Sequence, residues 1–147
     1  TAVPVVILRV PGIYGPGKLP LERLRKRLPL LREADSPFTN RIHVDDLVSV
    51  CRAAMARGRP GAAYNVSDGQ PSNMTDYFNR IADRVGLPRP PVVGRADIDQ
   101  LSPALRAFME ESKRLDTRRM REELGVELRY PSLEAGLDAC LAEVGVS

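Results

Sequence analysis

The side chains that could do chemistry in this chain are few and widely spaced. His43 is the lone histidine, and Cys51 and Cys140 are two isolated cysteines without a CxxC pair. Protein zinc sites need three or four His, Cys, Asp or Glu ligands at characteristic spacings. We therefore predict no metal site. We interpret both cysteines as buried, reduced thiols on the apolar faces of helices.

Arg41 and His43 alternate along a short extended segment, which would place both side chains on one face. A guanidinium can bind a planar oxyanion in bidentate fashion, or it can pair with Asp45 or Asp46 a few residues later. A lone histidine is more often structural than a proton shuttle. We assign no catalytic residue in this chain. For Asp46 we favour a structural role at the start of a helix, by capping and by the helix dipole.

The segment that leads to these residues begins with a strand. Residues 5–8 are continuously apolar and largely β-branched, which is typical of a fully buried strand in a parallel sheet. Such a strand needs neighbours on both edges. It runs into turns rich in glycine and proline over residues 11–17. Because a buried strand opens the chain, we expect a fragment of a larger protein.

Helical periodicity alternates with short extended segments along the rest of the chain. Expected caps or first-turn residues are Asp45 or Asp46, Asn73, Ser102, Asp116 and Ser132. Pro29 should end or kink the first helix. Helices are expected over residues 21–31, 45–58, 73–86, 102–109, 116–125 and 132–144, and extended segments over residues 41–44, 62–66 and 126–130.

These elements define the fold class. A chain of 147 residues is normally one domain. Its strands are few, short and separated by helices, so we predict an α/β architecture whose small strands complete a larger sheet.

Composition excludes several classes of protein. The net charge is only +3, although residues 1–59 carry 11 basic and 5 acidic side chains. Three phenylalanines, four tyrosines and no tryptophan supply little material for stacking bases, so we predict no nucleic-acid partner. No apolar run approaches the ~20 residues of a membrane span. We expect a cytoplasmic, reducing location and no membrane partner.

Three motifs that follow one another in this order indicate a protein family more specifically than any one of them alone. Residues 8–17 read LRVPGIYGPG, residues 40–47 read NRIHVDDL, and residues 64–69 read YNVSDG. Together they resemble the second half of extended short-chain dehydrogenases/reductases, the NAD(P)-dependent epimerase/dehydratase family. The stretch 111–125, followed by residues 130–132, resembles an atypical subgroup described as nucleoside-diphosphate-sugar epimerase-like. The resemblance covers essentially the whole chain.

The resemblance implies roles for individual residues. The backbone at Pro11, Gly12 and Ile13 would lie against the nicotinamide side of an NAD or NADP cofactor, where ligands meet the carboxyl ends of parallel strands. Arg41 matches an arginine that reaches nucleotide phosphates. A late basic position that closes over the substrate matches Lys113 and Arg114, although a solvated surface pair is an equal alternative.

The resemblance also shows what this chain lacks. Family catalysis needs a glycine-rich turn after the first strand and a Tyr-x-x-x-Lys pair, and neither is present. Tyr14 precedes Lys18 by four positions, but the intervening Gly-Pro-Gly cannot form the helix that would align them. Sugar epimerases commonly carry asparagine where this chain has Gly12, so the substrate could be a nucleotide-sugar or another carbonyl compound.

The resulting expectation is a C-terminal, substrate-binding portion of an NAD(P)-dependent epimerase/dehydratase or reductase, inactive by itself. Residues 1–17 would be the last-strand remnant of the dinucleotide-binding domain with its cofactor-facing turn, and residues 18–147 the substrate-binding domain. The cofactor would be NAD or NADP in the full-length protein, with no tight binding to this chain. The alternative is a non-catalytic module that senses a nucleotide or holds a protein partner. An exposed strand edge should promote self-association.

Overall fold

The computed structural model describes residues 3–143. Its strands form four pairs, of which β1–β6, β2–β5 and β3–β8 are parallel and β4–β7 is antiparallel. The strands are β1 (Ile7–Arg9), β2 (Gly12–Tyr14), β3 (Leu30–Leu31), β4 (Phe38–Thr39), β5 (Arg41–His43), β6 (Ala63–Asn65), β7 (Ser72–Asn73) and β8 (Val92–Val93).

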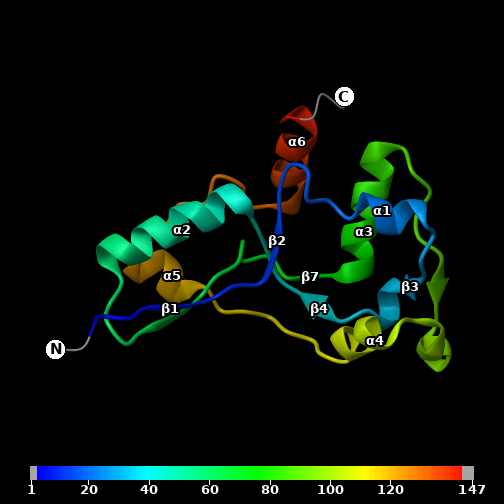
Figure 1. Ribbon diagram of the computed structural model, residues 1–147, viewed down its shortest axis with the longest axis horizontal. Helices are drawn as coiled ribbons and strands as arrows, with labels where there is room; N and C mark the ends of the chain where they lie inside the picture. The colour runs from blue at the N-terminus through cyan, green and yellow to red at the C-terminus, as the bar shows by residue number, and fades with distance from the viewer. Residues whose placement is uncertain (1–2, 144–147) are drawn as a thin grey trace.

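Helices surround these short strands (Figure 1). They are α1 (Leu21–Arg25), α2 (Val44–Arg57), α3 (Met74–Val85), α4 (Pro103–Met109), α5 (Arg118–Glu123) and α6 (Leu133–Glu143), with 3₁₀ turns at Glu33–Asp35 and Arg95–Gln100. No helix among residues 3–143 is both long and apolar enough to cross a membrane. The α/β class predicted from the sequence is confirmed.

Two apolar clusters hold the fold together. One joins α1, α3, α4 and α6, and includes the buried Tyr14, Phe78 and Leu137. The other joins α2, α5, β5 and β6, and includes Ile42 and Tyr64. In Figure 1, α2 and α5 lie on the left with β1, and α1, α3 and α4 lie on the right. Leu8 of β1 packs against the second cluster and Tyr14 of β2 belongs to the first, so residues 3–17 bridge both clusters.

The opening strand is parallel, as predicted, but it is not buried. Val5 is 58% exposed and Ile7 is 53% exposed. β1 pairs with β6 along one edge, and within residues 3–143 no strand pairs with its other edge. The prediction of a fully buried strand was therefore wrong for this chain, because only one of the two neighbours that such a strand needs is present in the described part.

The first helix is shorter than its leucine spacing predicts. α1 ends at Arg25, and Arg27 adopts a positive φ of 56°, a backbone conformation that cannot continue a helix. Pro29 follows, and Leu30 and Leu31 are fully buried in β3 instead of lying on a helix face. Leu28, expected on that face, is 37% exposed.

The expected caps of α3, α4 and α6 are confirmed. Asn73 accepts a hydrogen bond from the Asp76 amide at 2.7 Å, Ser102 from the Leu105 amide at 3.3 Å, and Ser132 from the Ala135 amide at 3.2 Å. These caps depend on side chains three residues from their partners. They are therefore visible in the sequence.

The buried face of α2 differs from the face that the sequence predicts. In α2, Cys51 is exposed and Met55 is 90% exposed, because the buried side of the helix is formed by Val50, Ala53 and Ala54. The prediction of a buried Cys51 was wrong, whereas Cys140 is buried as expected. In α4, Phe108 is 49% exposed, whereas Leu105 and Met109 are buried.

Candidate functional site

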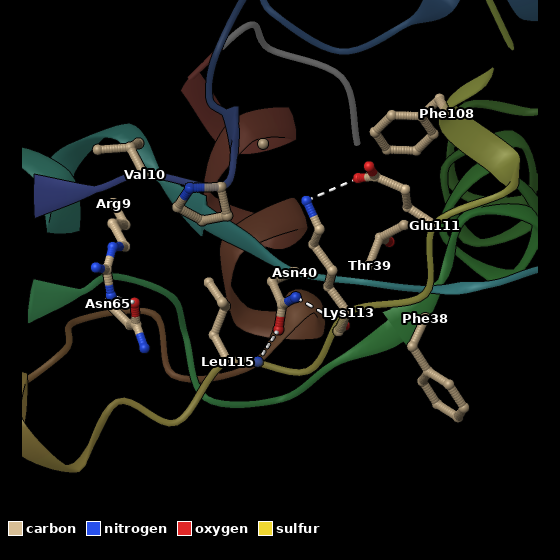
Figure 2. A pocket seen from close by; sticks show the side chains of 12 residues that line it. Arg9, Val10, Phe38, Thr39, Asn40, Asn65, Phe108, Glu111, Lys113 and Leu115 are labelled. Carbon is tan, nitrogen blue, oxygen red and sulfur yellow. Dashed lines mark hydrogen bonds and ion pairs between the residues drawn. The ribbon is translucent and has the colours of Figure 1, made fainter.

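A cavity of about 720 Å³ opens where the β1–β2 turn faces the β4 segment and the chain before α5 (Figure 2). Its walls come from four distant parts of the sequence. The lining residues are Arg9, Val10, Pro11, Gly12, Phe38, Thr39, Asn40, Asn65, Phe108, Glu111, Lys113 and Leu115.

The strand exit forms one wall of this cavity. Pro11 and Gly12, two of the three predicted cofactor-facing residues, belong to the lining. Gly12 begins β2, and a Cβ placed on it would lie 3.6 Å from the Asn40 carbonyl oxygen, an ordinary contact. Ile13 is 50% exposed and lies outside the lining, because successive side chains of a strand point to opposite faces.

The facing wall is residues 111–115, here called the strap, a segment outside the helices and strands that runs alongside β4. The Lys113 amide donates to the Phe38 carbonyl at 3.0 Å, and the Phe38 amide donates to the Ser112 hydroxyl at 3.1 Å. The strap thus follows β4 through backbone contacts. Its position does not depend on side-chain packing alone.

Lys113 and Arg114 point in different directions along this strap. Lys113 lines the cavity, where its ammonium lies 2.7 Å from the Glu111 carboxylate (Figure 2). The hydrogen bond from Lys113 lowers the pKa of Glu111 below its ordinary value. Arg114 instead places its guanidinium 3.8 Å from the centroid of the Phe38 ring, a cation–π contact. The cavity therefore receives one of the two predicted basic side chains.

Arg41 does not line the cavity and is only 5% exposed. Its guanidinium donates to Thr39 Oγ1 at 2.6 Å and to Ser72 Oγ, and it lies 4.3 Å from the centroid of the Tyr77 ring. Burial lowers the pKa of Arg41, and the neighbouring Tyr77 and Asp68 oppose that shift. Arg41 contacts the cavity through Thr39, a lining residue.

Tyr77 and Asp68, which oppose the lowered pKa of Arg41, are themselves largely buried. Burial raises the pKa of Tyr77 to about 12, with Arg41 opposing the shift, and burial also raises the pKa of Asp68. The Asp68 amide donates to the Arg41 carbonyl at 2.9 Å. Arg41 is therefore held by neutral hydroxyls, an aromatic ring and a nearby carboxyl group.

His43 and Asp46 have structural roles. His43 is 1% exposed and caps α2, with Nδ1 accepting from the Asp45 amide at 3.1 Å. Asp46 is also 1% exposed and accepts from the amides of Arg129 and Tyr130 at 2.7 and 2.9 Å. Asp46 lies in the first turn of α2, but the capping role predicted for Asp45 or Asp46 belongs to His43.

Several lining residues were not identified from the sequence. Asn40 binds residues 113 and 115 of the strap, and Asn65, the last residue of β6, donates to the carbonyl of Asp116, just beyond the strap, at 3.3 Å. Asn65 also accepts from Arg9 at 3.4 Å. The partners lie 51 to 75 residues away along the chain, so no local pattern reveals them.

Known proteins resemble this chain over part of their own length. No family model matches the chain. Short-chain dehydrogenase/reductase family 42E member 1 of Xenopus laevis is 34% identical over 98 residues, which are 56% of this chain and 25% of that protein. The structure of a functionally unknown conserved protein from Silicibacter pomeroyi is 41% identical, with a TM-score of 0.81, over 94% of this chain and 49% of that one.

The resemblance to short-chain dehydrogenases/reductases is confirmed. A more distant member of the same fold is an enzyme of Bordetella bronchiseptica, solved in complex with NAD and UDP. It is 23% identical and has a TM-score of 0.68, over 99% of this chain and 46% of that one. The chain thus spans about half the length of these solved proteins.

Proposed function

We propose that this chain is the substrate-binding portion of an NAD(P)-dependent epimerase/dehydratase or reductase of the short-chain dehydrogenase/reductase family. The observation that carries the proposal is the cavity itself. In it, the strand exit at Pro11-Gly12 faces the ammonium of Lys113 across a space of about 720 Å³. A short-chain dehydrogenase/reductase needs such a place, where a cofactor-facing backbone and a substrate-binding cation meet.

The proposed ligand is a nucleotide-sugar or a related carbonyl compound with an anionic group. Lys113 would bind the anionic part, and Phe108, which is partly exposed, would contact its apolar or planar part. The Bordetella enzyme of the same fold holds UDP, the nucleotide part of such a substrate.

The other predicted substrate residues act indirectly in this proposal. Arg114 holds Phe38 through its guanidinium, and Arg41 holds Thr39 through its hydrogen bond. Both side chains thereby shape the cavity wall without reaching the ligand themselves.

In the full-length protein, NAD or NADP would lie against the backbone of Pro11, Gly12 and Ile13 and would supply the redox chemistry. The 147-residue chain contains no Tyr-x-x-x-Lys pair that could transfer the proton. We therefore propose that the chain alone is inactive and that the boundary near residue 17 separates cofactor-facing from substrate-binding segments. NAD(P) should bind to the isolated chain no better than about millimolar, a threshold that a fluorescence titration measures directly.

A calorimetric titration with UDP tests the ligand proposal. UDP should bind the unsubstituted chain, and Lys113→Ala should weaken binding about tenfold, the loss of one charge-assisted contact. Lys26→Ala is the matched control, since the side chain of Lys26 is 63% exposed in an ion pair with Glu22 and that of Lys113 is 64% exposed. Equal affinity of the two variants would overturn the role of Lys113.

A second candidate is a non-catalytic module that holds a protein partner, and the exposed apolar residues near β1 favour it. Val3, Val5 and Ile7 are 80%, 58% and 53% exposed beside the strand edge that lacks a described neighbour. We propose that this edge mediates self-association. Light scattering should show a mass that rises with concentration and falls in Val5→Lys, whereas a concentration-independent monomer would contradict the proposal.

A further inference from the structure

One side-chain amide is placed to fix the cavity strap, residues 111–115. Asn40 donates from Nδ2 to the Lys113 carbonyl at 2.9 Å and accepts on Oδ1 from the Leu115 amide at 3.2 Å (Figure 2). These are backbone groups two residues apart, so a single planar amide spans the strap around Lys113.

The contacts of Asn40 complete the hydrogen bonding of the Lys113 backbone. The Lys113 amide donates to the Phe38 carbonyl, and the Lys113 carbonyl accepts from Asn40. Both polar backbone groups of Lys113 are therefore held by the segment 38–40.

Side chains alternate along the strap, since residues 111, 113 and 115 line the cavity and residues 112 and 114 do not. Fixing residues 113 and 115 therefore leaves Arg114 outside the lining. Arg114 accordingly lies over the Phe38 ring. A one-residue slip of the strap would exchange the positions of Lys113 and Arg114.

Apart from its backbone hydrogen bond to Phe38, the described contacts of Lys113 fix its position less firmly than Asn40 does. Its ion pair with Glu111 joins side chains that are 64% and 66% exposed, and such exposed pairs contribute little. The amide of Asn40 is half-buried and makes both of its contacts to backbone.

We propose that Asn40 is a positioning residue that holds Lys113 in register so that its ammonium faces the cavity. This inference rests on the proposed function, because it assigns Asn40 to the same ligand site. Asn40 itself acts through the strap and need not touch the ligand.

Limited trypsin digestion tests the positioning directly, since Lys113 and Arg114 are adjacent trypsin sites. Asn40→Leu removes the donor and the acceptor together, and cleavage after residues 113 and 114 should accelerate about tenfold relative to cleavage after Arg57 in α2. Asn79→Leu is the matched control, because Asn79 donates to Glu33 at 3.0 Å, away from the strap. Asn79→Leu should leave the ratio of cleavage rates unchanged.

A titration with UDP then connects the strap to the ligand. Asn40→Leu should weaken UDP binding about fivefold in the unsubstituted chain and should have no further effect in the Lys113→Ala background, because the two residues act as one unit. A merely structural role of Asn40 would weaken both backgrounds equally.

The outcomes separate this inference from the function on which it rests. Faster strap cleavage together with a UDP effect that requires Lys113 supports the role of Asn40. Unchanged strap cleavage, or an equal UDP effect in both backgrounds, overturns that role. Failure of the unsubstituted chain to bind UDP overturns the proposed function, and with it the ligand role of Asn40, even where strap cleavage accelerates.

Discussion

Replacing Asp46 with alanine should destabilise the fold more than replacing its exposed neighbour Asp45 with alanine. Asp46 is 1% exposed and accepts two backbone hydrogen bonds, from Arg129 and Tyr130, which hold the segment leading into α6. Hydrogen bonds to a charged group contribute about 1.5–3 kcal/mol each, while water can reach part of the freed backbone. We therefore expect Asp46→Ala to lower the free energy of unfolding by about 2–4 kcal/mol.

Urea unfolding followed by circular dichroism measures this loss. With a slope of about 2 kcal/mol per molar urea, the midpoint should fall by roughly 1–2 M. Asp45→Ala is the matched control, because the Asp45 side chain is 45% exposed and its nearest cation-forming partner, His43, lies 3.9 Å away. The control should cost less than about 1 kcal/mol.

An intermediate variant sharpens the reasoning. Asp46→Asn keeps one carbonyl oxygen as acceptor and should lose less stability than Asp46→Ala. Equal midpoints for Asp46→Ala and Asp45→Ala would refute the assignment of Asp46 as the group that anchors the entry into α6.

Three further predictions follow from single contacts. Gly136→Ala should cost about 2 kcal/mol or more, because its Cβ would lie 1.8 Å from the Tyr14 hydroxyl oxygen, and Tyr14→Phe should recover part of that loss in urea unfolding. Glu134→Gln should lower the melting temperature at pH 7 in low salt, because hydrogen bonds from Arg84 and Arg80 lower the pKa of Glu134 in the folded chain. The effect should shrink as the pH falls through that lowered pKa, and an effect that stays constant into acid would contradict this. A maleimide should label Cys51 in the native chain and Cys140 only after denaturation, which mass spectrometry distinguishes.

The elements with local signals were predictable from the sequence. Asn73 and Ser102 cap helices through partners three residues away, so their types and spacing are sufficient. The helix expected through Leu31 failed because the chain reverses at Arg27 and Leu31 finds its partner Val93 far along the sequence. Helical periodicity shows that such residues are apolar, but it does not show whether they are buried on a helix or in a strand.

The candidate site was only partly predictable, because the contacts that form it join residues far apart in the sequence. Lys113 and Pro11-Gly12 carry family motifs, and the structure brings them to one cavity. Arg41 carries a motif too, but its donors bind Thr39 and Ser72 inside the fold. The contact that fixes Lys113 joins Asn40 to a backbone group 73 residues away, which no spacing rule in the sequence reports.

Chemical-shift mapping by nuclear magnetic resonance tests the central claim most directly. On addition of UDP to the ¹⁵N-labelled chain, the amides of Gly12, Asn40 and Lys113 should shift together with one dissociation constant, because all three residues line the same cavity. Amides of α2, such as that of Cys51, should remain unchanged. Shifts confined to residues outside the cavity, or no shifts at millimolar UDP, would contradict the assignment of this cavity as the substrate site.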